Sequence, residues 1–146
     1  MNLDRDWIAA RIPHRGSMCL LDAVESWNDT EIVCRASSHR LVHNPLRAAH
    51  SLGIANGIEY AAQAMAVHGA LLAGADTAPQ AGYLTSVRDV QWRRARLDDV
   101  AGDLTIRAER ISGDELNILY RFSVHAEDTI LLSGRASVML DSTNLP

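Results

Sequence analysis

One carboxylate stands in a long apolar stretch of this chain. Between Ala48 and Ala75, Glu59 is the only residue that carries a full charge at neutral pH. Burying a lone carboxylate costs several kcal/mol unless it is paired or protonated. An acid in the first turn of a helix is also favoured by the helix dipole while it stays in contact with water, so the position of Glu59 alone does not decide between structure and function.

Gln63 moves the interpretation toward function. It follows Glu59 by four residues, so both side chains lie on one face of a helix that is otherwise built of Ala, Met, Val and Leu. A polar pair on such a helix predicts the floor of a pocket.

The composition bounds what kind of protein this is. The 146 residues are most simply one domain, residues 1–146, and the net charge of -4 argues against nucleic acid as a partner. All 14 basic residues are arginines, which excludes a Schiff-base lysine or a P-loop lysine. Cys19 and Cys34 form no C-x-x-C motif, so we expect small core residues and no metal site.

No part of the sequence predicts export or a membrane span. The N-terminus is charged and lacks the apolar core of a signal peptide, so we expect a cytoplasmic protein. The stretch 57–75 is long enough to cross a bilayer, but it contains Glu, Gln, His and three glycines. A buried helix of a globular protein is the better interpretation.

The elements that must position Glu59 follow from periodicity. In the first half we expect a short helix at 4–10, strands at 18–27 and 30–37 around the turn Asn28-Asp29, a loop at 38–53, and the apolar helix to about Gly74. After a connection rich in Pro and Gly, alternating apolar residues predict strands at 83–92, 104–108, 116–124 and 130–140. This order predicts an α+β fold, an antiparallel sheet wrapped around one long central helix.

Four motifs in this order resemble a known family. They are Ile12-Pro13-His14-Arg15 with Leu20-Leu21-Asp22-Ala23-Val24, the helix start Ile58-Glu59-Tyr60-Ala61-Ala62-Gln63, the segment Gly82-Tyr83-Leu84 to Val90-Gln91-Trp92, and Ser133-Gly134-Arg135-Ala136. Together they resemble the hot-dog 3-hydroxyacyl-[acyl-carrier-protein] dehydratases of fatty-acid and polyketide synthesis, from about residue 10 to 140. Within that family the chain is most similar to the small dehydratase-like proteins of aryl-polyene-type pathways.

The resemblance implies a hydro-lyase that uses one acid and one histidine. The histidine removes the proton next to the thioester, and the acid handles the departing hydroxyl. Glu59 would be the acid, held neutral by a desolvated pocket and oriented by Gln63. The family pattern H-F-P-G is reduced here to His43-Asn44-Pro45-Leu46, which makes His43 the candidate base, with His39 and His50 as competitors.

Other positions take more modest roles. His14 is expected to hold the N-terminal loop, and His68 and His125 are not assigned to catalysis. Backbone N–H groups at the helix start would polarise the thioester carbonyl, with Ile54 at the family's glycine position and Gly53 supplying the conformational freedom.

Partners are implied by the same resemblance. Four arginines could meet the phosphopantetheine phosphate and the acidic surface of an acyl carrier protein, or could equally form a solvated loop paired with Asp98 and Asp99: Arg88, Arg93, Arg94 and Arg96. The substrate would be carried on phosphopantetheine, with no other cofactor. We expect a homodimer, or a heterodimer with a sister hot-dog subunit.

Two other functions stay open from the sequence. A hot-dog acyl thioesterase would use Glu59 to activate water and would need no loop histidine. A non-catalytic acyl-binding subunit of a dehydratase heterodimer would keep the fold without a complete site, and the altered H-x-P-G loop is what favours it.

Overall fold

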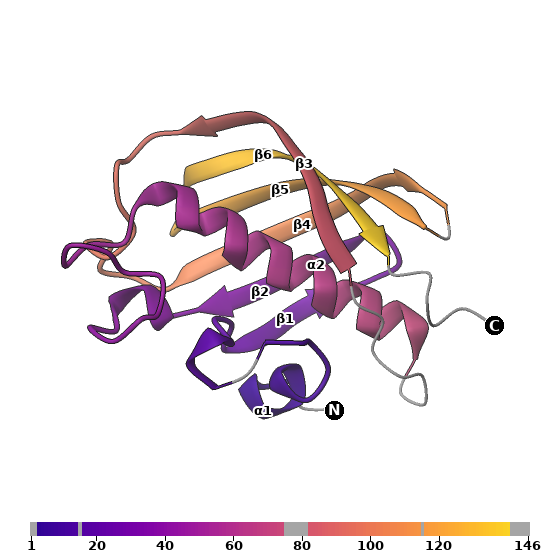
Figure 1. Cartoon of the computed structure of the whole chain (residues 1–146), viewed down its shortest axis with the longest axis horizontal. Helices are drawn as coiled ribbons and strands as arrows, with labels where there is room; N and C mark the ends of the chain where they lie inside the picture. The colour runs from indigo at the N-terminus through magenta and orange to yellow at the C-terminus, as the bar shows by residue number, and fades with distance from the viewer. Residues whose placement is uncertain (1–2, 15, 75–81, 115, 141–146) are drawn as a thin grey trace.

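A six-stranded antiparallel sheet curves around one long helix, which confirms the predicted architecture (Figure 1). This computed structural model describes residues 3–14, 16–74, 82–114 and 116–140. The first half holds α1 (Arg5–Ala9), η1 (Gly16–Met18), β1 (Ala23–Trp27), β2 (Glu31–Ala36), η2 (Ser38–Arg40), η3 (Ile54–Asn56) and α2 (Gly57–Ala73). The second half holds β3 (Gly82–Trp92), β4 (Leu104–Gly113), β5 (Asn117–Ala126) and β6 (Thr129–Leu140).

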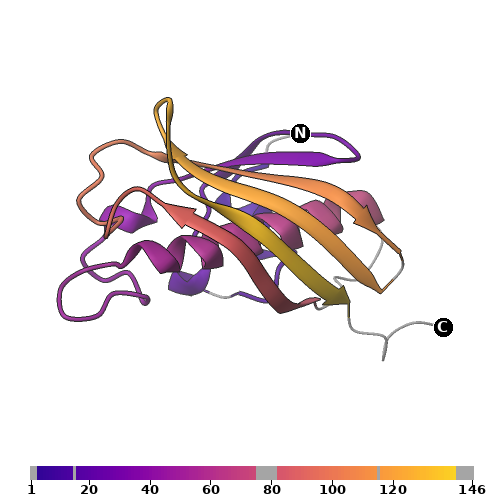
Figure 2. The ribbon, with the colours of Figure 1, turned by 90° about the horizontal axis from the view of Figure 1, so that it is seen from above.

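The order of the strands explains how α2 comes to lie across the sheet. The strands run β1-β2-β4-β5-β6-β3, so β3, the strand that follows α2 in the chain, joins at the edge opposite β1. Helix α2 lies across the sheet between these two strands: Gly57 at its start lies against Leu132 of β6, and His68 further along contacts Asn28 in the turn between β1 and β2. Figure 2 shows α2 on one side of the sheet, which bends over it.

The helix is anchored where it begins. A Cβ atom added to Gly57 would lie 2.6 Å from Cδ2 of Leu132 on β6, so only glycine permits this close approach to the sheet. Further along α2, large or apolar side chains are fully buried against the sheet, among them Tyr60, Ala61, Ala64 and Val67. Glu59 and Gln63 lie on another face of the same helix, next to the segment that precedes β1.

The segment before β1 differs from the prediction. Residues 18–27 were expected to form one strand, but β1 begins only at Ala23 and Gly16–Met18 form a 3-10 turn. The backbone N–H of Leu20 donates to the side chain of Gln63 and not to a neighbouring strand, which is why the strand cannot extend further back. Cys19 is therefore a buried loop residue, whereas Cys34 lies in β2.

Two predicted features lie outside the described residues: Arg15 of the P-H-R motif and the connection at 75–81. Within the described residues, no helix combines the length and the apolar character needed to cross a bilayer.

Candidate active site

Glu59 is held by a histidine from the N-terminal segment. Nε2 of His14 lies 2.9 Å from Oε1 of Glu59, and Nε2 of Gln63 donates to the same oxygen at 3.3 Å. His14 was expected only to hold the N-terminal loop, because it lies 45 positions before Glu59 and nothing in its local pattern shows where its ring will point. The P-H-R motif was the one available signal.

Gln63 is the second residue that binds Glu59, and its own side chain is held by the N-terminal segment. Its side chain is fully buried, its Oε1 accepts from the Leu20 backbone N–H at 2.9 Å, and its Nε2 donates to the Met18 carbonyl at 2.7 Å. Because the amide oxygen must be the atom that faces the N–H of Leu20, the orientation of the amide group is determined. Gln63 thus joins the N-terminal segment to α2 beside Glu59, to which it also donates.

The electrostatics of Glu59 differ from the prediction. The hydrogen bond from His14 lowers the pKa of Glu59, and this outweighs partial burial, which acts in the opposite direction. The side chain is also 34% exposed and not sealed in an apolar interior. The expectation of a neutral, unpartnered acid was therefore wrong, since a close donor stabilises the ionised form.

A cavity of about 490 Å³ opens beside this pair. Glu59, His14 and Pro13 line the part nearest the start of α2. Small residues of α2 then form one wall, and β3, β5 and β6 form another: Ala62, Ala66, Gly69, Ala70 and Ala73, with Leu84, Ile118, Tyr120, Val138 and Leu140. The cavity is thus largely apolar and carries its carboxylate at one end, as expected for a site that holds an acyl chain next to a reacting group.

His68 belongs to the core and not to this site. It is fully buried, with Nε2 2.8 Å from the Asn28 carbonyl and Nδ1 2.7 Å from the hydroxyl of Tyr120. A carbonyl can only accept, so Nε2 carries the proton and Tyr120 donates to Nδ1. Burial lowers the pKa of His68 and raises that of Tyr120 to about 12. Both side chains are therefore neutral at physiological pH.

The loop before α2 places its three histidines differently. His43 and His50 are exposed, and within the described part of the chain neither side chain makes a hydrogen bond or ion pair. His39 is fully buried, with Nε2 3.1 Å from the Val100 carbonyl, and burial lowers its pKa. None of the three makes the contact with Glu59 that His14 makes.

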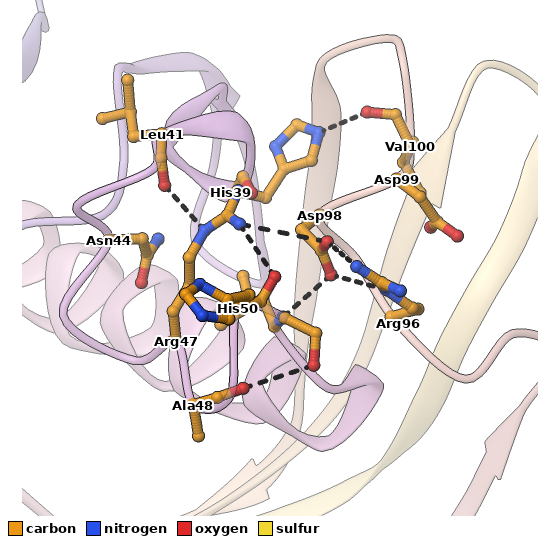
Figure 3. Close-up of polar contacts among 12 residues, drawn as sticks. His39, Leu41, Asn44, Arg47, Ala48, His50, Arg96, Asp98, Asp99 and Val100 are labelled. Atoms are coloured by element: carbon orange, nitrogen blue, oxygen red, sulfur yellow. Dashed lines mark hydrogen bonds and ion pairs between the residues drawn. The ribbon is translucent and has the colours of Figure 1, made fainter.

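The side chain of Arg47 binds backbone carbonyl groups of this loop (Figure 3). The guanidinium donates to the Leu41 carbonyl at 2.8 Å and to the carbonyls of His39 and His50 at 3.4 Å each. It also lies 4.0 Å from the Asp98 carboxylate. The shape of the loop is therefore set by main-chain acceptors, which every residue type would offer.

Asp98 connects the same loop to the segment after β3 (Figure 3). Its carboxylate accepts from the backbone N–H of Leu52 at 2.8 Å and from Nε of Arg96 at 3.0 Å. These donors hold the pKa of Asp98 well below its usual range. The end of the loop before α2 is thereby attached to the segment between β3 and β4.

The helix start does not offer the backbone donors that were predicted. The N–H of Ile54 already donates to the Ala95 carbonyl at 3.0 Å, and the N–H of Gly57 donates to carbonyls of η3. Gly53 has φ -64°, a conformation open to any residue. The predicted roles of Ile54 as a free donor and of Gly53 as a source of special backbone freedom were wrong, because η3 and the bridge to Arg96 use these groups.

The arginine cluster divides into two kinds. Arg94 pairs with Asp99 at 3.0 Å and Arg96 pairs with Asp98, so the structural alternative holds for these two. The side chains of Arg88 and Arg93 are exposed, and no ion pair to either is found among the described residues. Among the described residues of this cluster, Arg88 and Arg93 are therefore the arginines whose charge is not balanced by a paired acid.

The comparisons with known proteins decide the family. A family model described as ApeP dehydratase matches residues 7–145. The chain belongs to the ApeP-like dehydratase family. The sequence resemblance to hot-dog dehydratases is therefore confirmed, and the motifs that carried it lie within the matched residues. No curated protein sequence matches this ApeP-like chain.

Solved structures confirm the hot-dog fold of this ApeP-like protein. The dehydratase heterocomplex ApeI:P from Xenorhabdus doucetiae gives a TM-score of 0.80 at 23% identity, covering 93% of this chain and 91% of that chain. A thioesterase from Pseudomonas aeruginosa gives 0.59 at 15% identity, covering 81% and 79%. One from Staphylococcus aureus gives 0.60 at 16%, covering 82% and 92%. At these identities the likeness shows the shared fold.

Proposed function

We propose that this ApeP-like protein removes water from a 3-hydroxyacyl thioester carried on an acyl carrier protein, leaving a 2-enoyl thioester for fatty-acid or polyketide-type synthesis. The observation that carries this proposal is the Glu59 carboxylate, held by His14 at the end of a largely apolar cavity. Membership of a dehydratase family supports the type of reaction.

The reaction takes one proton from C2 and releases a hydroxyl group from C3 as water. Because Glu59 is held ionised, it must gain a proton before it can give one to the departing hydroxyl. The proton removed from C2 balances the one that leaves in the water molecule. Glu59 therefore takes up a proton from solvent and gives it to the hydroxyl as the C3–O bond breaks, while a second group takes the proton from C2 and later releases it to solvent.

His43 is our candidate for the second group. It lies exposed on the loop before α2 and, among the described residues, is committed to no polar contact. A histidine in this state is available to a site that is completed by a second subunit. In this proposal Gln63 acts on the substrate through Glu59, and the backbone at 53–54 shapes the entry to α2.

The edge of the sheet supports a partner subunit. Strand β3 is an outer strand, and it exposes Tyr83, Leu84 and Trp92, the last at 62%. An open edge with large apolar side chains is costly in water and is usually covered. We propose that a second hot-dog subunit, identical or a sister, covers it. The related heterocomplex from Xenorhabdus doucetiae supports a sister subunit.

Arg88 and Arg93 are proposed to meet the carrier protein. Guanidinium groups bind phosphate and carboxylate groups in a bidentate manner, which suits a phosphopantetheine arm and an acidic protein surface. Arg94 and Arg96 lie in the same segment and contribute charge, although their own acids reduce it.

The test is turnover of two thioesters. The protein, alone and with a hot-dog sister subunit, is incubated with 3-hydroxyacyl and saturated acyl thioesters, and products are identified by mass. Enoyl product that falls about 10²- to 10⁴-fold in Glu59→Gln supports the proposal. Released thiol and free acid would instead identify a thioesterase. Dehydration by the sister pair that is unchanged in Glu59→Gln would show a non-catalytic subunit.

A further inference from the structure

All polar contacts of the Glu59 side chain fall on one of its two oxygens. His14 and Gln63 both reach Oε1, and in the part of the chain that the structure describes no donor reaches Oε2. Oε2 is not sealed off either: among described residues, the buried side-chain polar atoms without a partner are Nδ1 of His14 and Nδ1 of His39. Among the described residues Oε2 thus has no donor, and it is accessible, in a side chain that lines the cavity.

Both donors to Oε1 have a fixed direction. The amide of Gln63 is oriented by the Leu20 N–H and the Met18 carbonyl, so its NH₂ group must face Glu59. The Nε2 atom of His14 faces a carboxylate oxygen, which is an acceptor only, so Nε2 is the donor. The last torsion of a glutamate side chain is otherwise broad, and two donors on one oxygen restrict it.

We infer that His14 is a positioning residue: together with Gln63 it clamps Oε1 of Glu59 and presents Oε2 to the substrate. The assignment of Oε2 to a substrate rests on the proposed function, whereas the clamp itself does not. The value of such a clamp is geometric, because a misplacement of about 1 Å at a reacting group costs on the order of 100-fold in rate. His14 belongs to the same chain as Glu59, so the clamp needs no second subunit.

The clamp also sets the charge of Glu59. The hydrogen bond from His14 is the largest cause of the lowered pKa, followed in the same direction by that from Gln63. Among the described residues, the other ionisable side chains that line the cavity are Arg11 from the N-terminal segment and Tyr120 from β5. Replacing His14 with a side chain that cannot donate should raise the pKa of Glu59, because the ionised form loses its main support.

Two substitutions separate positioning from proton transfer. His14→Gln keeps a side-chain N–H donor but cannot exchange protons, and His14→Leu removes the donor at similar size. His125→Gln is the matched control, since His125 lies on β5, contacts Ser123 and does not line the cavity. His14→Ala replaces the Leu variant if that variant does not fold, as judged by circular dichroism.

The first measurement is the titration of the Glu59 carboxyl by carbon-13 NMR without substrate. We expect the pKa of Glu59 to rise in His14→Leu, to stay near the wild-type value in His14→Gln, and not to move in the control. The second is kcat, KM and the pH profile of dehydration. We expect kcat to fall about 10- to 100-fold in His14→Leu with little change in KM, the alkaline limb, on which Glu59 loses its proton, to move to higher pH, and most of kcat to return in His14→Gln.

Two results would overturn the inference. An unchanged Glu59 titration in His14→Leu would show that the contact does not hold the carboxylate. A His14→Gln variant as slow as His14→Leu would make His14 a proton-transfer group and not a positioning one. If the wild-type protein dehydrates no thioester, alone or with a sister subunit, the proposed function fails, while the titration still decides whether the clamp exists.

Discussion

Two segments bring histidines toward the start of α2, and they are held in opposite ways. In residues 10–14 and 16–20, the His14 side chain reaches Glu59, and the Gln63 side chain of α2 binds the backbone of Met18 and Leu20. Residues 38–53 are held through their backbone, since the Arg47 guanidinium donates hydrogen bonds to three carbonyl groups of this loop. The first segment therefore depends on the identity of its side chains. The second keeps its shape while the side chains of His43 and His50 remain exposed.

The largest expected effect tests the exposed loop. His43→Ala should lower dehydration by the assembled enzyme about 10²-fold or more, because it removes the proposed base, and it should leave the free energy of unfolding unchanged because the side chain is exposed. Turnover by the sister pair and urea unfolding measure the two effects. Full activity in His43→Ala would remove the loop from the chemistry and leave His14 as the histidine nearest Glu59.

Gln63→Leu should detach the first segment from α2 and lower the stability of the protein. It leaves the Leu20 N–H and the Met18 carbonyl without their partners in a buried position, and each such loss costs about 1 to 3 kcal/mol. We expect the free energy of unfolding in urea to fall by about 2 to 5 kcal/mol. A loss below about 1 kcal/mol would mean that the N-terminal segment does not need this anchor. Gln91→Leu, at an exposed position on β3, is the control.

Arg47→Met should loosen the second segment alone. The carbonyls of His39, Leu41 and His50 lose a charged donor but can turn to water, so we expect a loss of about 1 to 3 kcal/mol. Hydrogen exchange should become faster over residues 39–51 and stay unchanged in α2. If exchange rises equally in both, Arg47 supports the whole fold and the contrast between the segments disappears.

His39 and Glu59 also predict losses of stability in different pH ranges. Burial lowers the pKa of His39, so the unfolded chain binds its proton first, and the stability that depends on neutral His39 is lost as pH falls below the ordinary value of 6.5. The lowered pKa of Glu59 matters only below its own ordinary value of 4.5. Unfolding free energies measured from pH 8 to 4 should therefore fall in two steps.

Single substitutions show which residue causes each step in the pH dependence of stability. His39→Gln should flatten the decline between pH 7 and 5, and Glu59→Gln should flatten only the decline below about pH 5. His68 and His125 also have lowered pKa values from burial and will keep part of the upper step. An upper step that is unchanged in His39→Gln would show that His39 stays accessible to protons in the folded state.

The smallest effect concerns the carrier protein. Arg88→Ala combined with Arg93→Ala should raise KM for the carrier-bound substrate roughly fivefold at low salt and little at high salt, as expected for two exposed charges. Arg121→Ala, whose side chain pairs with Glu109 on the sheet, is the control. An equal effect at all salt concentrations would argue against electrostatic docking at this segment.

The sequence by itself determined the features that depend on neighbouring residues. A four-residue spacing places Glu59 and Gln63 on one helical face, and alternating apolar residues predict the strands, so the sheet around one helix could be foreseen. The motifs also placed the chain in a dehydratase family. These inferences hold because helical and strand periodicities are local.

Only the tertiary structure decided what surrounds Glu59. The contact with His14 joins positions 14 and 59 across the 3-10 turns η1, η2 and η3 and the strands β1 and β2, and no local pattern fixes the direction of a loop side chain. Likewise, the Ile54 N–H donates to the carbonyl of Ala95, a residue distant in sequence, and no local pattern predicts that contact. The charge of Glu59 follows from these contacts, because the pKa of a carboxyl group depends on the donors beside it and not on the apolar sequence around it.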